Sequence, residues 1–260
     1  MGAPVRLQTH VWNPLGDRRA LLLHGLTSDG VCWWRLASQL ADEGWMVLAP
    51  DLRGHGRSPA AVAYDLPTLA ADVELLGDGW ELIVGHSLGG AIAAQLLARS
   101  PDIAAAVLLD PVLVLPAVTR SALHADLRQE AGAVTAARVR AEHPTWDERD
   151  VQRKVQAAAL CTPDVIDAVL DHNDPWDLTA LVAAWNARVH LLAADPQQGG
   201  LLDPALAARL ADGRRVTAET VACGHSIQRE APATVSQAVA RVAPLRATAG
   251  PDEESSGGRW

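Results

Sequence analysis

Short apolar runs alternate with segments of helical spacing along most of the chain. The runs that predict strands are residues 5–12, 20–23, 45–49, 82–84, 103–109, 189–194 and 216–221. The segments between them that predict helices are residues 33–43, 68–76, 204–210 and 232–242, with a further helix that begins near Leu88. Strands that alternate with helices in this way are typical of an α/β fold, in which helices cover both faces of a mostly parallel sheet.

This rhythm stops between residues 112 and 187, where we expect helices and no strand. Thr145 with Glu148 has the pattern of a capping box, and Thr162-Pro163 has that of an N-cap followed by proline at the first helical position. The pattern therefore predicts a core made of residues 1–111 and 188–246, with a helical cap at 112–187. The polar, acidic segment 247–260 is expected to be disordered.

One stretch combines a strand, a sharp turn and a helix around a serine. Gly85-His86-Ser87-Leu88-Gly89 follows an apolar run and precedes an alanine-rich segment. A serine at such a turn is strained and exposes its hydroxyl, and glycines two positions before and after it relieve crowding. Backbone N–H groups at the start of the following helix point to the same spot and could hold an oxyanion. Ser87 is thus the candidate nucleophile.

A serine nucleophile needs a base, and the base needs a carboxylate that orients it. His225 lies in a short loop after the last expected strand and is the candidate base. Two carboxylates qualify as the acid, because Asp110 and Asp195 each follow an apolar strand and each keep the order serine, acid, histidine. We favour Asp110 slightly and keep Asp195 as the alternative.

Four short motifs give the chain a family resemblance. They are HGL at 24–26, DLRGHGRS at 51–58, GHSLGG at 85–90 and GHS at 224–226, and together they resemble the α/β-hydrolase superfamily. The resemblance implies an eight-stranded sheet with a lid after the sixth strand, and a catalytic histidine at His225. It also implies an oxyanion hole made by the backbone N–H groups of Leu26 and Leu88. Trp33, Trp34 and Trp176 are the candidate substrate contacts.

Composition narrows the classes of partner. Hydrophobic residues make up 49% of the 260 residues, enough for a large buried core. The formal net charge is −9, so we expect neither nucleic acid nor an anionic membrane as a partner. The first ten residues lack a signal-peptide pattern, and the three cysteines are widely spaced. We therefore expect a cytoplasmic protein with a small-molecule substrate and no metal or organic cofactor; its oligomeric state stays open.

Our hypothesis is a serine hydrolase that cleaves an ester or lactone of a mainly apolar small molecule through an acyl-enzyme. The same superfamily and triad also hydrolyse carbon–carbon bonds next to a ketone, so that reaction stays open. A hydrolase fold that only binds a small ligand is the alternative from another class. Haloalkane and epoxide hydrolysis are disfavoured, because those relatives carry aspartate where this chain has Ser87.

Overall fold

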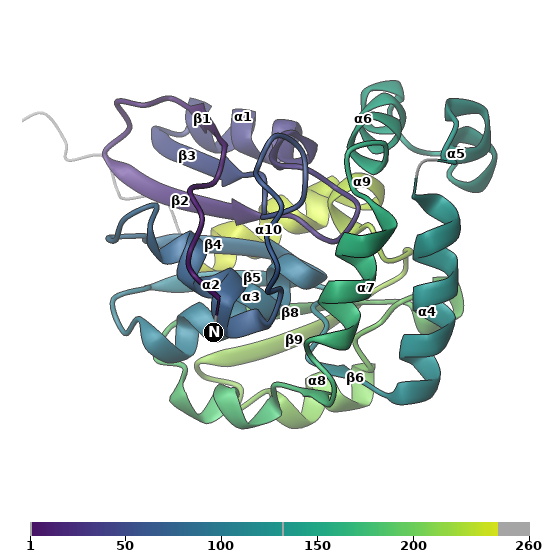
Figure 1. Ribbon diagram of the computed structural model, residues 1–260. Helices are drawn as coiled ribbons and strands as arrows, with labels where there is room; N and C mark the ends of the chain where they lie inside the picture. The colour runs from purple at the N-terminus through teal and green to yellow at the C-terminus, as the bar shows by residue number, and fades with distance from the viewer. Residues whose placement is uncertain (1, 132, 244–260) are drawn as a thin grey trace, which may run out of the picture.

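The computed structural model describes residues 2–131 and 133–243, and its centre is one twisted sheet (Figure 1). The strands in spatial order are β1 (Thr9–Trp12), β3 (Trp45–Pro50), β2 (Arg18–Leu23), β4 (Leu82–His86), β5 (Ala105–Leu109), β8 (Arg188–Ala194) and β9 (Val216–Val221). Strand β1 pairs with β3 in the antiparallel direction, and all other pairs in this sheet are parallel. The α/β fold expected from the alternation of strands and helices is confirmed.

Within the described residues the sheet has seven strands, so the eight strands implied by the resemblance are wrong. The chain before Thr9 explains the difference. The N–H of Val5 donates to Asp72 Oδ1 at 2.6 Å, and the N–H of Gln8 donates to Ser58 Oγ at 2.8 Å. Because these donors bond to side chains of the core, the segment does not form another edge strand, and β1 is shorter than expected.

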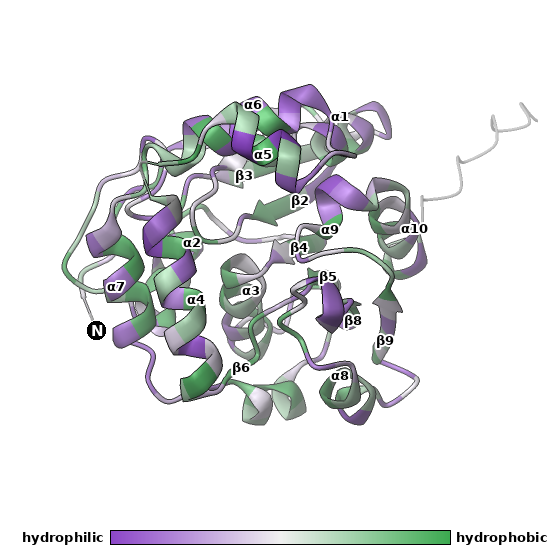
Figure 2. Ribbon diagram, turned by 90° about the vertical axis from the view of Figure 1, so that its right-hand side faces the viewer, coloured by the Kyte–Doolittle hydropathy of each residue, from purple (hydrophilic) through white to green (hydrophobic). Residues whose placement is uncertain are grey.

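The central strands are buried on both faces, and their alternate residues belong to different cores. In β2, Leu21 and Leu23 join one core, whereas Ala20 and Leu22 join the other. The first core lies under α2 (Leu66–Glu74), α3 (Leu88–Arg99) and α8 (Pro204–Leu210); the second lies under the 3₁₀ helix η1 (Gly30–Trp33), α1 (Trp34–Asp42) and α10 (Pro232–Val242). Figure 2 shows hydrophobic strands in the middle and hydrophilic residues on the outer faces of the helices.

Between β5 and β8 the chain forms a separate helical segment, which we call the insertion (residues 112–187). Its elements are β6 (Val114–Leu115), α4 (Ala117–Glu130), α5 (Ala136–Glu142), α6 (Glu148–Ala158), α7 (Pro163–Asp171), β7 (Trp176–Asp177) and the 3₁₀ helix η2 (Thr179–Ala184). Helices α4 to α7 stand at one end of the sheet (Figure 1). The two short strands were not expected from the pattern, which is helical almost throughout.

Two helix starts in the insertion were predicted from capping patterns. Helix α7 begins at Pro163 with Thr162 at the N-cap position, as predicted, although the Thr162 side chain makes no capping hydrogen bond. The predicted capping box at Thr145 is wrong, because the N-cap residue of α6 is Asp147. The Asp147 carboxylate accepts a hydrogen bond from the N–H of Arg149 at 2.8 Å. Aspartate caps a helix at least as well as threonine, so the nearer residue is used.

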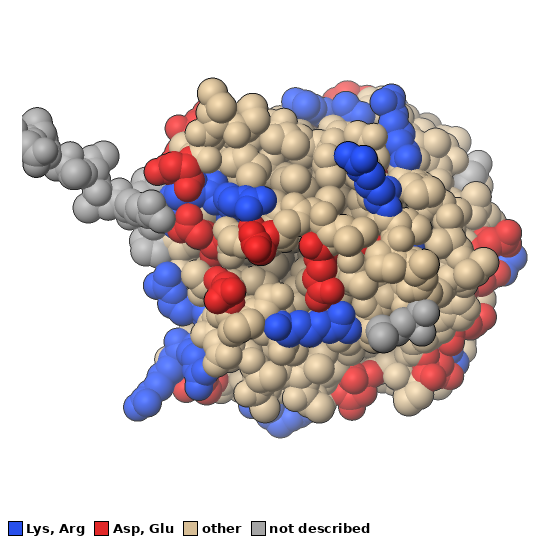
Figure 3. Space-filling model, turned by 60° about the vertical axis from the view of Figure 1, so that its left-hand side comes forward, with Lys and Arg blue, Asp and Glu red and all other residues tan. Residues whose placement is uncertain are grey.

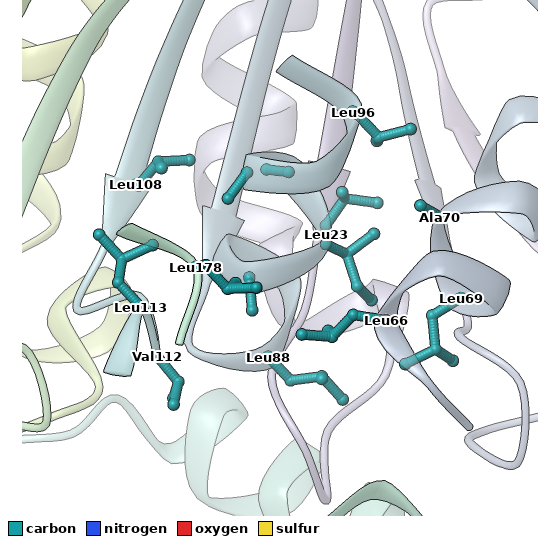
Figure 4. Packing of buried hydrophobic residues seen from close by; sticks show 14 of the residues in the cluster. Leu23, Leu66, Leu69, Ala70, Leu88, Leu96, Leu108, Val112, Leu113 and Leu178 are labelled. Carbon is teal, nitrogen blue, oxygen red and sulfur yellow. The ribbon is translucent and has the colours of Figure 1, made fainter. Parts of the chain in front are cut away.

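Both ends of the insertion meet at its base. Strands β6 and β7 pair in the antiparallel direction, with Val114 opposite Asp177. The N–H of Leu178 donates to the carbonyl of Leu113 at 2.8 Å. Leu113 and Leu178 also pack into the same hydrophobic cluster as Leu108 of β5 (Figure 4). The insertion is therefore anchored to the sheet through its two ends together.

The surface and the chain ends add two observations. On the face shown in Figure 3, acidic and basic side chains are intermixed. Across residues 2–131 and 133–243, every helix is too short or too polar to span a membrane. The segment 247–260, for which we expect disorder, lies outside the described residues, as does the end of the core piece 188–246.

Candidate active site

Ser87 occupies the turn between β4 and α3 in a conformation that L-residues rarely adopt. Its φ is 54° and its ψ is −116°. The turn is tight enough to exclude side chains on both sides: a Cβ on Gly85 would come within 2.5 Å of the Gly89 carbonyl oxygen, and a Cβ on Gly89 within 2.1 Å of the Leu23 carbonyl oxygen. The N–H of Ser87 donates to the carbonyl of Leu109 at 3.0 Å, which helps to hold this strained residue.

The imidazole of His225 lies against the carboxylate of Asp110. His225 Nδ1 donates to Asp110 Oδ2 at 2.6 Å. Asp110 is fully buried at the end of β5, and its carboxylate also accepts hydrogen bonds from the N–H groups of Ala194 (3.1 Å), Leu201 (2.8 Å) and Leu202 (3.0 Å). Four donors around one carboxylate fix its orientation. The contact leaves Nε2 as the imidazole nitrogen available for proton transfer.

Asp195, the other candidate acid, has local partners. Its carboxylate accepts hydrogen bonds from the N–H of Gln197 at 2.9 Å and from Gln198 Nε2 at 3.0 Å. The bond from the Gln198 side chain, followed by that from the Gln197 backbone, lowers the pKa of Asp195. Asp195 therefore caps the short 3₁₀ helix η3 (Pro196–Gln198), whereas the structure brings Asp110 to His225.

The two residues whose backbone N–H groups are proposed for the oxyanion hole follow the carboxyl ends of β2 and β4. Leu88 is the first residue of α3, so its N–H has no partner within the helix. Leu26 follows β2 and lines the same cavity as Leu88 and Ser87. The preceding loop is held by His24, whose Nε2 accepts a hydrogen bond from the N–H of Leu52 at 2.9 Å. His24 Nδ1 donates to the Gly25 carbonyl at 2.8 Å.

Two histidines at the site are kept neutral by their surroundings. Burial lowers the pKa of His24 to about 4, which agrees with the accepting role of its Nε2. Burial also lowers the pKa of His86 well below its ordinary value, and the nearby His225 adds to this effect. His86 Nε2 donates to the backbone carbonyl of His225 at 2.9 Å, and the two rings lie 4.7 Å apart. His86 thus supports the loop that carries His225, a role that sequence reasoning missed.

A cavity of about 270 Å³ lies between the sheet and the insertion. Ser87, His225, Leu26 and Leu88 all line it. Much of the remaining wall is apolar and consists of Val112, Leu115, Leu123, Leu127, Val169, Leu170, Trp176 and Leu201. The polar part of the wall includes Thr27, Ser28, Asp126, His143, Lys154, Gln228 and Arg229.

The expected tryptophan contacts divide into two groups. Trp176 lines the cavity, and its Nε1 donates to the carbonyl of Val112 at 2.8 Å. Trp33 and Trp34 are not among the lining residues: Trp33 is buried in the core under α1, and Trp34 Nε1 donates to Asp150 at 2.9 Å. Trp146 of the insertion does line the cavity and was missed, because the local pattern around it predicts a helix start and says nothing about which residues face the site. Within residues 2–131 and 133–243, no group of three His, Cys, Asp or Glu side chains could hold a metal ion.

A family model matches most of the chain. The model describes the alpha/beta hydrolase family and matches residues 20–238. The lipase LipV of Mycobacterium tuberculosis is 37% identical over 174 residues, which cover 65% of this chain and 62% of LipV. A pyrethroid hydrolase of Sphingobium wenxiniae is 34% identical over 105 residues, which cover 38% of each chain. The chain therefore spans less than two thirds of the length of these curated relatives.

Solved structures agree on the fold. An N-formylmaleamic acid deformylase from Pseudomonas putida S16 superposes with a TM-score of 0.74 and 23% identity, and the match covers 90% of this chain and 96% of the deformylase. At this level of identity the likeness concerns the fold alone. The sheet, the strained serine turn and the family match lead to one conclusion: the chain belongs to the alpha/beta hydrolase family.

Proposed function

We propose that this chain is a serine hydrolase that cleaves a carboxylic ester or a lactone of a small molecule with a mainly apolar body. One observation carries the proposal: a strained, buried serine shares a cavity with a histidine whose other nitrogen bonds to a buried carboxylate. This combination activates a hydroxyl that is otherwise a weak nucleophile. The apolar lining of most of the cavity supports a substrate with little charge near the leucines.

The proposed reaction begins with proton transfer from Ser87 Oγ to His225 Nε2, while Oγ forms a bond to the carbonyl carbon of the substrate. Asp110 stabilises the imidazolium that results, and it stays ionised throughout. The negative charge moves to the carbonyl oxygen, where the N–H groups of Leu26 and Leu88 stabilise it. Collapse of this intermediate breaks the bond to the alcohol oxygen, and His225 returns the proton to that oxygen.

The second half of the reaction repeats these steps with water. His225 takes a proton from a water molecule, and the hydroxide attacks the acyl carbon bound to Ser87. The carboxylic acid leaves and the serine hydroxyl is restored. With a lactone, the alcohol and the acid belong to one molecule, so a hydroxy acid is the product.

The test is hydrolysis of p-nitrophenyl esters from short to long acyl chains, together with labelling by a fluorophosphonate that reacts with activated serines. We expect wild type to prefer short chains, because the cavity is only about 270 Å³. Ser87→Ala is expected to lose at least about 10³-fold in kcat and all labelling. The matched control is Ser121→Ala on the exposed face of α4, which should leave both unchanged.

The outcomes separate the alternatives. If wild type neither turns over esters or lactones nor is labelled at Ser87, the hydrolase proposal is wrong, and a protein that only binds its ligand becomes the better account. If wild type is labelled at Ser87 but cleaves only a dienoate-type diketone, the serine is active and the bond cleaved is a carbon–carbon bond.

A further inference from the structure

A buried arginine forms part of the cavity wall close to the candidate base. Arg229 lies in the short helix α9 (Ile227–Glu230), four positions after His225. Its side chain lines the cavity, although the residue is only 6% exposed. A guanidinium keeps its charge at every pH at which proteins are folded. The wall of the proposed site therefore contains a permanent positive charge.

The guanidinium has donors without acceptors. Arg229 Nε and Nη2 are buried and have no hydrogen-bond partner among the described residues. These two nitrogens lie on the same side of the planar group, so their N–H bonds can meet the two oxygens of one carboxylate. A charge that is buried without a partner is strongly unfavourable. An anionic ligand at the Nε and Nη2 edge would remove this cost.

The neighbouring carboxylate of Glu230 already has other partners. Glu230 Oε2 accepts a hydrogen bond from the N–H of Gly224 at 2.6 Å, and Glu230 Oε1 accepts one from Trp146 Nε1 at 3.4 Å. The Arg229 Cζ atom lies 4.6 Å from the centre of the Trp146 ring, so one face of the guanidinium has an aromatic contact while its edge stays unpaired.

A second cation lines the same cavity. Lys154 comes from α6 of the insertion, and its Nζ donates to Thr27 Oγ1 at 3.0 Å. Asp126 also lines the cavity and carries an acidic side chain, and Gln228 beside Arg229 is neutral. The unpaired edge of Arg229 favours an anion over a neutral group of the same shape.

We propose that the substrate carries a carboxylate in addition to the ester or lactone that is cleaved, and that Arg229 binds this carboxylate. The inference rests on the proposed function and narrows its substrate class to half-esters of dicarboxylic acids and carboxylated lactones. The apolar wall holds the carbon skeleton, and the charged end pairs with the guanidinium. Nε and Nη2 are shielded from solvent, so binding of the carboxylate at this edge requires the side chains around it to move.

The experiment compares two p-nitrophenyl esters of glutaric acid that differ in one group. One has a free carboxylate at its far end, and in the other this end is a methyl ester. Wild type is expected to hydrolyse the anionic ester with at least about tenfold higher kcat/KM. Arg229→Met should lower kcat/KM for the anionic ester by about 10- to 100-fold and leave that for the neutral ester within threefold, and Arg229→Lys should restore part of the loss.

The matched control is Arg149→Met, since Arg149 is an exposed arginine that also lies over a tryptophan ring, that of Trp34. Arg149→Met should leave kcat/KM unchanged for both esters. The inference is overturned if wild type prefers the neutral ester, or if Arg229→Met lowers the hydrolysis of both esters equally. If the methionine variant does not fold, Arg229→Lys is used in its place: it keeps the charge but lacks the planar fork, so it should lower kcat/KM for the anionic ester by a smaller factor and leave that for the neutral ester unchanged.

A binding measurement separates this inference from the proposed function. Glutarate is titrated calorimetrically into Ser87→Ala protein with Arg229 intact and with Arg229→Met. Binding that weakens at least about tenfold without the guanidinium supports the anion site even if wild type cleaves no ester. Hydrolysis of the neutral ester without glutarate binding keeps the proposed function and overturns the anion site. If the protein shows neither hydrolysis nor glutarate binding, both the proposed function and the anion site are wrong.

Discussion

At the scale of single residues, the assignment of the acid depends on which carboxylate touches His225. Asp110→Asn removes the charge that stabilises the imidazolium and allows the wrong tautomer of the ring, so kcat should fall about 10³- to 10⁴-fold. Asp195→Asn should stay within threefold of wild type, because Asp195 bonds only within its own turn. The measurement is kcat of both variants and wild type with the best p-nitrophenyl ester. Circular dichroism verifies that the variants fold. A large loss for Asp195→Asn alone would assign the acid to the other strand.

The sequence could narrow this choice to two residues and no further. Asp110 and Asp195 both follow apolar strands, and neither pattern carries information about the loop that follows β8. In the structure, the N–H groups of Leu201 and Leu202 in that loop turn back onto Asp110. Such a contact between residues about ninety positions apart leaves no mark in local spacing, whereas the serine turn is local and its glycines predict it directly.

At the scale of elements, the junction of β2, β4 and α3 is packed through a glycine. A methyl group on Gly89 would lie 2.1 Å from the Leu23 carbonyl oxygen and 2.6 Å from that of His24. Backbone atoms of a central strand cannot move away cheaply, so Gly89→Ala should lower the free energy of unfolding by at least about 3 kcal/mol. Urea unfolding measures this change.

A second glycine serves as the control for that substitution. Gly213 has a φ of +70°, and a Cβ added there meets nothing within 4 Å. Gly213→Ala therefore carries only the cost of a left-handed conformation, about 1 kcal/mol. Equal losses in the two variants would contradict the prediction, because they would show that the close approach of α3 to β2 at Gly89 costs no more than a left-handed conformation.

Elements were predicted best where the pattern was local and strong. Helices α8 and α10 and strand β9 have the bounds that the spacing indicated. The short strands β6 and β7 were not predictable, because two residues cannot show a periodicity and their pairing joins segments sixty positions apart. Two residues of the cavity wall were missed for the same reason: Trp146 and Arg229 meet only in the folded chain.

At the scale of the whole molecule, buried neutral histidines make stability depend on pH. Burial lowers the pKa of His24 to about 4 and that of His55 to about 3, and it lowers the pKa of His86 well below its ordinary value. In the unfolded chain each has a pKa near 6.5, so the unfolded state binds more protons between about pH 4 and 6.5. Stability is thus fully present above about pH 6.5 and is lost as pH falls below it.

The expected slope follows from proton binding. Each of these histidines contributes up to about 1.4 kcal/mol per pH unit below pH 6.5. Urea unfolding at pH 5, 5.5, 6 and 7.5 measures the slope. His55→Asn removes one titrating group and retains a donor for the Arg53 carbonyl, so its slope should be shallower by about one proton. An unfolding free energy that does not change between pH 5 and 7.5 would contradict the prediction.

The number of strands shows how pattern and resemblance differ as guides to the whole fold. The apolar runs of the chain number seven and match the seven strands of the sheet, whereas the resemblance implied one more. A family description averages over members, whereas the hydrogen bonds of Val5 and Gln8 depend on two side chains of this chain, Asp72 and Ser58. The interrupted rhythm also indicated the insertion, although not how its helices stand over the sheet.

The base of the insertion has a consequence for exchange of this segment. The chain leaves the sheet through β6 and returns through β7, and these two strands are hydrogen-bonded to each other. Because the two ends adjoin, another segment with the same spacing between its ends could replace the insertion without shifting the strands that hold Ser87 and Asp110. Exchange between Leu113 and Leu178 would therefore alter the lining residues that the insertion supplies to the cavity and leave those of the sheet in place.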